Sequence, residues 1–148
     1  MKQMTMVELL KRVQLFSGLG DDELQQVVSI CHEVNINPNT VFIEQNTTGS
    51  EMYIIAEGTV DVFIHGLNNS RSLVILGQGQ VVGEMALIDQ GYRSASVRST
   101  KNGAHLFKIE RDTFQSLCND NTLIGFVVMR NMALDLAFKL RHRNLAEL

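Results

Sequence analysis

The spacing of apolar residues in the first part of the chain, residues 1–33, predicts two short helices. In each of them apolar side chains recur three and four positions apart, so that they share one helix face. The break between the helices falls at residues 17–20, and the acidic residues 21–23 favour the positive end of the second helix. The apolar positions are Met6, Leu9, Leu10, Val13 and Phe16 in the first helix and Leu24, Val27, Val28 and Cys31 in the second.

The middle part of the chain, residues 34–110, predicts a set of short β-strands. Val60, Val62 and Ile64 alternate with residues of the opposite face, as in a half-buried strand. Many short strands in one small domain favour a β-roll or jelly-roll barrel. The other strand candidates are Val41–Glu44, Met52–Ala56, Leu73–Leu76, Ala95–Thr100 and His105–Ile109, and turns are expected at Glu57-Gly58 and Lys101-Asn102-Gly103, among other places.

The last part, residues 111–148, is expected to be helical again. Asp112 with Gln115 is typical of a capping box for a short helix. Asn121 or Thr122 then caps a long helix that runs toward the C-terminus. That helix is apolar on more than one side and needs more than one partner surface, so it either packs against a second protomer or lies wholly buried in its own chain. The expected fold class is mainly β with flanking helices, in a single domain of residues 1–148.

The segment from Gly83 to Ala95, GEMALIDQGYRSA, combines groups that bind an anion. Gly83 lets the backbone turn tightly and leaves room for a ligand beside the following amides. Residues 84–88 favour a helical turn, whose free amides attract negative charge. Arg93, at the start of the next strand, can direct two N–H groups at oxygens of the same anion. We therefore expect a phosphate here.

Glu84 is unexpected beside a phosphate, because a carboxylate repels an anion. The conflict disappears if Glu84 faces an uncharged part of the ligand and accepts a hydrogen bond from a sugar hydroxyl. A nucleoside triphosphate would require a longer glycine-rich loop with a lysine and a metal ligand, and this pattern is absent from the sequence. The residues favour a nucleotide with one cyclised phosphate.

Two stretches, residues 83–87 (GEMAL) and 93–97 (RSASV), resemble the two halves of the phosphate-binding cassette of the cyclic nucleotide-binding domain family. This family includes the catabolite activator protein and the regulatory subunits of protein kinase A. The resemblance extends over roughly residues 5–147 and takes in residues 15–19 and 52–60. It implies that Arg93 and the amides of Ala86 and Ser94 contact the phosphate, and that Glu84 binds the ribose 2′-hydroxyl.

The chain departs from the family pattern at four positions. Tyr92 stands where a proline often precedes the arginine, and Val82 replaces the usual phenylalanine before Gly-Glu. Asn39 and Asn46 replace glycines, but asparagine tolerates the left-handed backbone that such turns need. None of these changes removes an implied ligand contact.

The ligand implied by the resemblance is cAMP or cGMP. Ser94 favours cAMP, because cGMP-selective members tend to carry threonine at this position. We expect Leu73 and Val74 to form apolar walls beside the base, and Phe138, Lys139 or Arg141 of the final helix to cover it. The expected ligand-binding residues are thus Gly83, Glu84, Met85, Ala86, Arg93, Ser94, Ala95, Leu73 and Val74, with no catalytic residue, no metal and no cofactor.

Composition argues against several other functions. A formal charge of −3 gives no basic face for nucleic acid, and no window is long and apolar enough for a membrane span. Without a secretory signal at the N-terminus, a cytoplasmic location is expected. The chain has no room for an output domain after Leu148, so it either acts on a separate, unidentified effector or is the front part of a longer protein.

Two alternatives stay open beside a cyclic-nucleotide receptor. One is a domain of this fold that has lost its ligand and serves only in protein interaction, although it would have little reason to keep both Glu84 and Arg93. The other is a cupin-like metal enzyme, which needs clustered histidines. The four histidines, His32, His65, His105 and His142, stand apart, and Cys31 and Cys118 match no metal or redox spacing.

Overall fold

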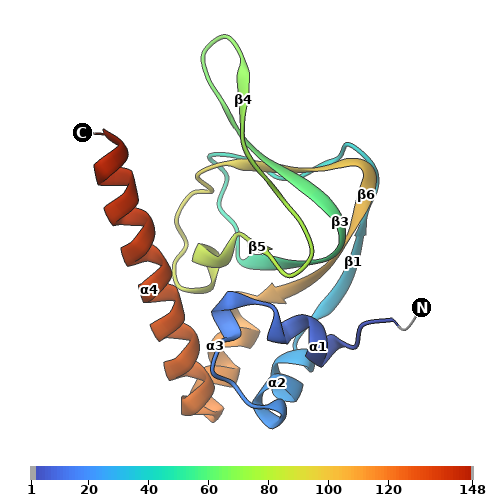
Figure 1. The fold of residues 1–148 in the computed structure, drawn as a ribbon, viewed down its shortest axis with the longest axis vertical. Coiled ribbons are helices and arrows are strands. Elements are labelled where there is room, and N and C mark those ends of the chain that lie inside the picture. Colours follow the sequence, from blue (N-terminus) through green and yellow to red (C-terminus); the bar gives the residue numbers. More distant parts are fainter. Residues whose placement is uncertain (1–2, 148) are drawn as a thin grey trace.

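The computed structural model describes residues 3–147 and confirms the expected class, an antiparallel β-roll flanked by helices at both ends of the chain (Figure 1). The sheet is rolled without closing into a barrel. The elements are α1 (Met6–Lys11), the 3₁₀ helix η1 (Gln14–Phe16), α2 (Asp21–Val28), β1 (His32–Ile36), β2 (Val41–Ile43), β3 (Glu51–His65), β4 (Ser70–Leu76), β5 (Val81–Val82), the 3₁₀ helix η2 (Glu84–Leu87), β6 (Ser96–Glu110), α3 (Arg111–Asp120) and α4 (Thr122–Glu147).

The sheet is built around two long strands, β3 and β6, which pair with each other in the order β1-β6-β3-β4. The short strand β2 lies beside β6, and β5 lies beside β3. The hairpin of β3 and β4 extends away from the rest of the molecule (Figure 1). Since β5 pairs with Tyr53 and Ile54 and leads directly into η2, the sheet places the start of the predicted cassette beside the beginning of β3.

Both long strands run through positions where the pattern predicted turns. β3 continues across Glu57-Gly58, and β6 continues across residues 101–103, so the two predicted strand ends are wrong. The register of the β3–β6 pair instead shifts between Ile55 and Glu57 and again between Gly58 and Val60. A bulge absorbs the irregular residues while the ladder continues on both sides of it.

Other local predictions were also wrong in detail. β1 begins at His32, where no strand was predicted, and the first helix divides into α1 and η1. The capping box at Asp112 and Gln115 is absent: α3 begins after Glu110 without a side-chain cap, and Gln115 Nε2 donates to the Leu87 carbonyl at 3.3 Å. Gln115 is thus drawn to a partner outside its own helix. The cap at Asn121 is confirmed, since its Oδ1 accepts from the Ile124 amide at 3.4 Å.

The hydrophobic core has two parts. The helical end of the molecule encloses a cluster that includes Leu10, Leu24 and Phe114, all fully buried. The concave side of the sheet holds a smaller cluster with Ile55 and Leu106 at its centre. Because the second cluster fills only part of the concave side, the sheet keeps open space beside β5 and η2.

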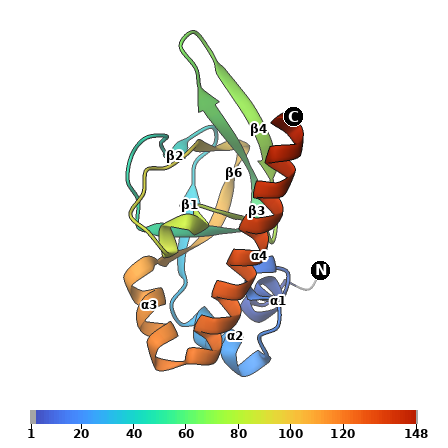
Figure 2. The same ribbon diagram turned by 90° about the vertical axis from the view of Figure 1, so that its left-hand side faces the viewer.

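The long helix α4 is buried along one side and open along the other. Its first half packs into the core through Ile124, Val128 and Met132, and Asn131 Nδ2 donates to the carbonyls of Leu15 and Ser17 at 2.9 and 2.8 Å. Large apolar side chains stay exposed elsewhere on the helix: Leu123, Phe126 and Leu134 point away from these buried residues, and Phe138 and Leu140 lie beyond the core. Of the two alternatives for this helix, complete burial in its own chain is excluded, because α4 extends past the core alongside the sheet (Figure 2). No helix in residues 3–147 is both long and apolar enough to cross a membrane.

Candidate functional site

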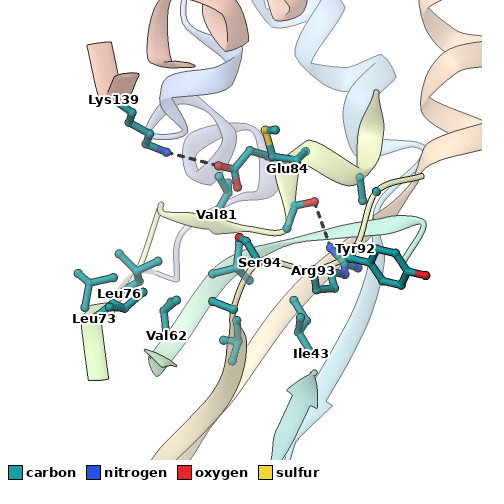
Figure 3. Close-up of a pocket in the computed structure, with 18 of the residues that line it drawn as sticks. Ile43, Val62, Leu73, Leu76, Val81, Glu84, Tyr92, Arg93, Ser94 and Lys139 are labelled. Carbon is teal, nitrogen blue, oxygen red and sulfur yellow. Dashed lines mark hydrogen bonds and ion pairs between the residues drawn. The ribbon is translucent and has the colours of Figure 1, made fainter. Parts of the chain in front are cut away.

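A cavity of about 390 Å³ opens on the concave side of the sheet, within the range of small-molecule sites (Figure 3). Its lining comes from β2, β3, β4, β5, the cassette, β6 and α4. All nine residues expected to bind the ligand line this one cavity. The alternation along β3 could have indicated Val62 as a further lining residue. The lining residues that were not predicted from the sequence are Ile43, Val62, Leu76, Val81, Val82, Asp89, Gly91, Tyr92 and Val97.

The apolar wall of the cavity depends on a bulge in β4. Val62 of β3 pairs with Val74, while the next residue, Phe63, pairs with Ser72. Leu73 is therefore the extra residue of β4, and such a bulge changes the direction of a side chain. Leu73 and Val74 both line the cavity and are 49% and 46% exposed, so they offer apolar surface that the chain itself leaves uncovered.

Arg93 lies at the opposite end of the cavity and is only 9% exposed. Its Nη2 donates to the Glu51 carbonyl at 2.8 Å, and its Nη1 donates to the Gly83 carbonyl at 3.3 Å (Figure 3). The Glu51 carboxylate is farther away, 3.8 Å from Nη2. A buried guanidinium with neutral carbonyl partners and one distant carboxylate retains a strong attraction for an anion.

Neighbouring groups hold Arg93 in place from two directions. Its amide donates to the Thr47 carbonyl at 2.7 Å, and its own carbonyl accepts from the Asn46 amide at 2.8 Å. Asn46 has φ 68°, which confirms that asparagine carries the left-handed turn here. Gly49 packs against the guanidinium so closely that a Cβ at this position would collide with it. Gly49 was not predicted as a site residue, since only the tertiary structure brings it to Arg93.

Glu51 has supporting contacts of its own. Tyr53 donates its hydroxyl to Glu51 Oε1 at 3.3 Å, and Ser50 donates to Glu51 Oε2 at 3.2 Å. Burial and the negative charge of Glu51 raise the pKa of Tyr53 to about 12, so the phenol stays protonated and keeps donating at neutral pH. These bonds hold Glu51 in position beside Arg93.

The cassette turn differs in one respect from what the resemblance implies. Gly83 has φ 75°, a conformation that glycine adopts without strain, and it starts the short 3₁₀ helix η2. In η2 the Ala86 amide donates to the Gly83 carbonyl at 3.1 Å. That amide is therefore already engaged, because a 3₁₀ turn closes after three residues. A phosphate would have to share the Ala86 N–H.

Glu84 forms an ion pair with α4 across the cavity. Its Oε1 lies 3.5 Å from Lys139 Nζ (Figure 3). The same amine lies 2.8 Å from Asp135 Oδ2 on its own helix. Partial burial lowers the pKa of Lys139, but the two carboxylates outweigh this and the net shift is upward, so the amine is charged. Of the three residues expected to cover the base, only Lys139 lines the cavity, and Phe138 is 60% exposed.

The histidines and cysteines form no comparable site. Among the side chains that the structure describes, no three His, Cys, Asp or Glu residues come together as metal ligands would. Burial raises the pKa of Cys31 to about 12 and also raises the pKa of Cys118. Because the thiolate is the reactive form, Cys31 is inert near neutral pH.

The comparisons with known proteins agree with this geometry. A profile of the family described as the cyclic nucleotide-binding domain matches residues 33–121. The chain is 30% identical over 137 residues to a cyclic AMP receptor protein of Thermus thermophilus, covering 92% of this chain and 61% of that protein. It is 25% identical over 116 residues to a cGMP-dependent protein kinase of Caenorhabditis briggsae, covering 77% of this chain and 16% of the kinase.

The structural comparison gives a similar result. A crystal structure of the Thermus thermophilus catabolite activator protein has a TM-score of 0.80 and 30% identity, with 90% of this chain and 61% of that chain covered. The chain thus spans about three fifths of the bacterial relative and about one sixth of the kinase.

Proposed function

The chain belongs to the cyclic nucleotide-binding domain family, and on that premise we propose that it is a regulatory module that binds cAMP in the cavity beside η2. The observation that carries the proposal is the convergence of a buried guanidinium, a carboxylate and an uncovered apolar wall on one cavity of about 390 Å³. These groups match the phosphate, the ribose and the base of one small nucleotide.

Each group has a separate role in this proposal. Arg93 binds the phosphate, exchanging its bonds to neutral carbonyls for stronger, charge-assisted bonds to an anion. Glu84 accepts a hydrogen bond from the ribose 2′-hydroxyl. Leu73 and Val74 cover one face of the base, which removes their exposed apolar area from water. The Ser94 hydroxyl lies in the same cavity, next to the phosphate-binding arginine.

The choice between cAMP and cGMP follows from Ser94 and from the relatives. Ser94 stands where cGMP binders tend to carry threonine, and the bacterial relative, which matches more of this chain than the kinase does, is named as a cyclic AMP receptor.

We expect isothermal titration to give heat with both nucleotides and a lower Kd for cAMP. Tighter binding of cGMP would contradict the choice of base. Heat from neither nucleotide would overturn the proposal and favour a domain that serves only in protein interaction.

We propose further that the bound nucleotide is released unchanged and that the bound state acts on a separate effector. Among the described residues that line the cavity, the hydroxyls of Tyr92 and Ser94 form no hydrogen bond to a carboxylate or a histidine that could act as a general base. Chromatography of cAMP after prolonged incubation with the protein would show a hydrolysis product if this view were wrong.

A second copy of this chain is the partner that we propose for the open side of α4. Leu123, Phe126 and Leu134 lie along that side, opposite the buried residues Ile124, Val128 and Met132. A row of large apolar side chains along a helix favours pairing with a similar row. The same row in two copies would produce a symmetric interface.

Replacing an apolar side chain on this row by an acid should prevent the pairing. We expect Leu134→Glu to convert the dimer to a monomer, because two such helices would bring carboxylates into an apolar contact. Light scattering at several protein concentrations measures the mass. Leu67→Glu is the matched control, since Leu67 is fully exposed at the β3–β4 turn. A monomeric unaltered chain at all concentrations would contradict the proposed dimer.

A further inference from the structure

We infer that Lys139 recognises the sugar of the nucleotide, not its base: with Glu84 it forms a two-residue cradle for the ribose 2′-hydroxyl and so joins α4 to the ligand. The inference rests on the proposed function, since it names the part of the ligand that a residue of the same site contacts. It differs from the expectation drawn from the sequence, in which Lys139 was one of three candidates to cover the base.

The cradle follows from the hydrogen-bonding capacity of the two side chains. Lys139 has three N–H donors, of which one is directed at Asp135 Oδ2 at 2.8 Å and a second at Glu84 Oε1 at 3.5 Å. Glu84 Oε2 takes part in none of the hydrogen bonds or ion pairs among the side chains that the structure describes. One donor and one acceptor are therefore free side by side, and a hydroxyl, which both donates and accepts, satisfies both.

The charges at this position also favour the hydroxyl of an anionic ligand. Glu84 and Asp135 together carry two negative charges, and without a cation between them they would repel a phosphate ester. Lys139 offsets one of these charges, and its pKa is shifted upward, so it stays charged. Glu84 is thereby held ready to accept a hydrogen bond while the repulsion is reduced.

The other side chains of α4 between residues 122 and 142 do not reach the cavity in which the base would lie. Among the described residues of this helix, Lys139 is the one that lines the cavity, and the apolar wall for the base comes from β4. Lys139 instead pairs with Glu84 of η2, the carboxylate proposed to bind the ribose. We therefore expect α4 to respond equally to adenine and guanine nucleotides and to depend on the 2′-hydroxyl.

The same contact connects the two halves of α4 to different parts of the molecule. Asn131 and the buried residues before it attach the first half to the core. For residues 133–142 of α4, the structure describes one polar side-chain contact with another part of the molecule, the ion pair of Lys139 with Glu84. Binding of the hydroxyl by Glu84 and Lys139 therefore changes a contact of the C-terminal half of α4.

Titration of one variant with three nucleotides tests the cradle. We expect Lys139→Met to weaken cAMP and cGMP by the same factor, about two- to fivefold, the range for partly exposed charge pairs. The Kd of 2′-deoxy-cAMP, which lacks the hydroxyl, should change less. The ratio of the Kd of 2′-deoxy-cAMP to that of cAMP should accordingly fall, by at most about two- to fivefold. Lys139 is 58% exposed, so the variant should fold normally.

Arg141→Met is the matched control, because it removes the same charge from the same helix two residues away without altering the cavity lining. In Arg141→Met the ratio of the Kd of 2′-deoxy-cAMP to that of cAMP should equal the ratio in the unaltered chain. Three results for Lys139→Met would each overturn the inference while the proposed function stands. They are an unchanged ratio of the two Kd values, tighter binding of cAMP, and a change in Kd that differs between cAMP and cGMP. If the unaltered chain bound neither nucleotide, the proposed function would fail first.

Discussion

Replacing Arg93 by alanine is expected to weaken cAMP binding by about 30-fold or more, the cost of truncating one partner of a buried, hydrogen-bonded charge pair. The side chain is 9% exposed, so few waters can replace the bonds that a bound phosphate would lose. Lysine should not restore binding, because an ammonium cannot reproduce the planar pair of N–H donors. Isothermal titration measures the loss.

Two controls separate this effect from general damage. Arg71→Ala removes the same charge from exposed strand β4, where Arg71 pairs with Ile64 and does not line the cavity, and it should leave the Kd nearly unchanged. Thermal unfolding of both variants checks the fold, since Arg93 also bonds the carbonyls of Gly83 and Glu51. Full affinity in a folded Arg93→Ala protein would show that the phosphate binds elsewhere.

Gly49→Ala is expected to weaken cAMP binding by about tenfold although it removes no charge and no ligand contact. A Cβ at position 49 would collide with the Arg93 guanidinium. The guanidinium lies at the end of a flexible side chain and can shift at small cost, so the protein should stay folded. The shifted donors lose at least one charge-assisted hydrogen bond to the phosphate, worth about 1.5 kcal/mol or more, or about tenfold in Kd.

Gly77→Ala is the matched glycine control for this prediction. A Cβ at Gly77 would lie 3.8 Å from Thr59 Cγ2, an ordinary contact, and Gly77 does not line the cavity. Titration and thermal unfolding of both variants should show normal melting in each and weaker binding only in Gly49→Ala. Equal affinities would mean that the position of Arg93 in the free protein does not matter for the ligand.

The local pattern of apolar and polar residues predicted the order of the helices and strands well and the residues at which they end poorly. The alternation of Val60, Val62 and Ile64 correctly marked a strand, although Asp61 and Phe63 show that the other face of β3 is buried as well. The predicted turn at Glu57-Gly58 was wrong, because pairing with β6 on both sides carries the strand through the irregular residues. Strand ends depend on the neighbouring strand, which the local sequence does not contain.

The candidate site likewise has a part that the local sequence predicted and a part that only the folded chain brings together. The cassette could be predicted because its groups lie within thirteen residues, Gly83 to Ala95, and its turn and arginine have local signals. Gly49 and Glu51 approach Arg93 from another part of the chain, and nothing in their own neighbourhood indicates this. Lys139 was named as a candidate to cover the base, and its contact with Glu84 became visible only in the folded chain.

By itself, the sequence determined the helical and strand zones, the turn at Gly83 and the chemical types of Glu84 and Arg93. These features depend on backbone preferences and on side chains close together in the chain. The tertiary structure alone decided which side of α4 stays open, that Lys139 pairs with Glu84, and that Arg93 fits against Gly49. Those depend on packing between distant segments, because burial and close approach are properties of neighbours in space.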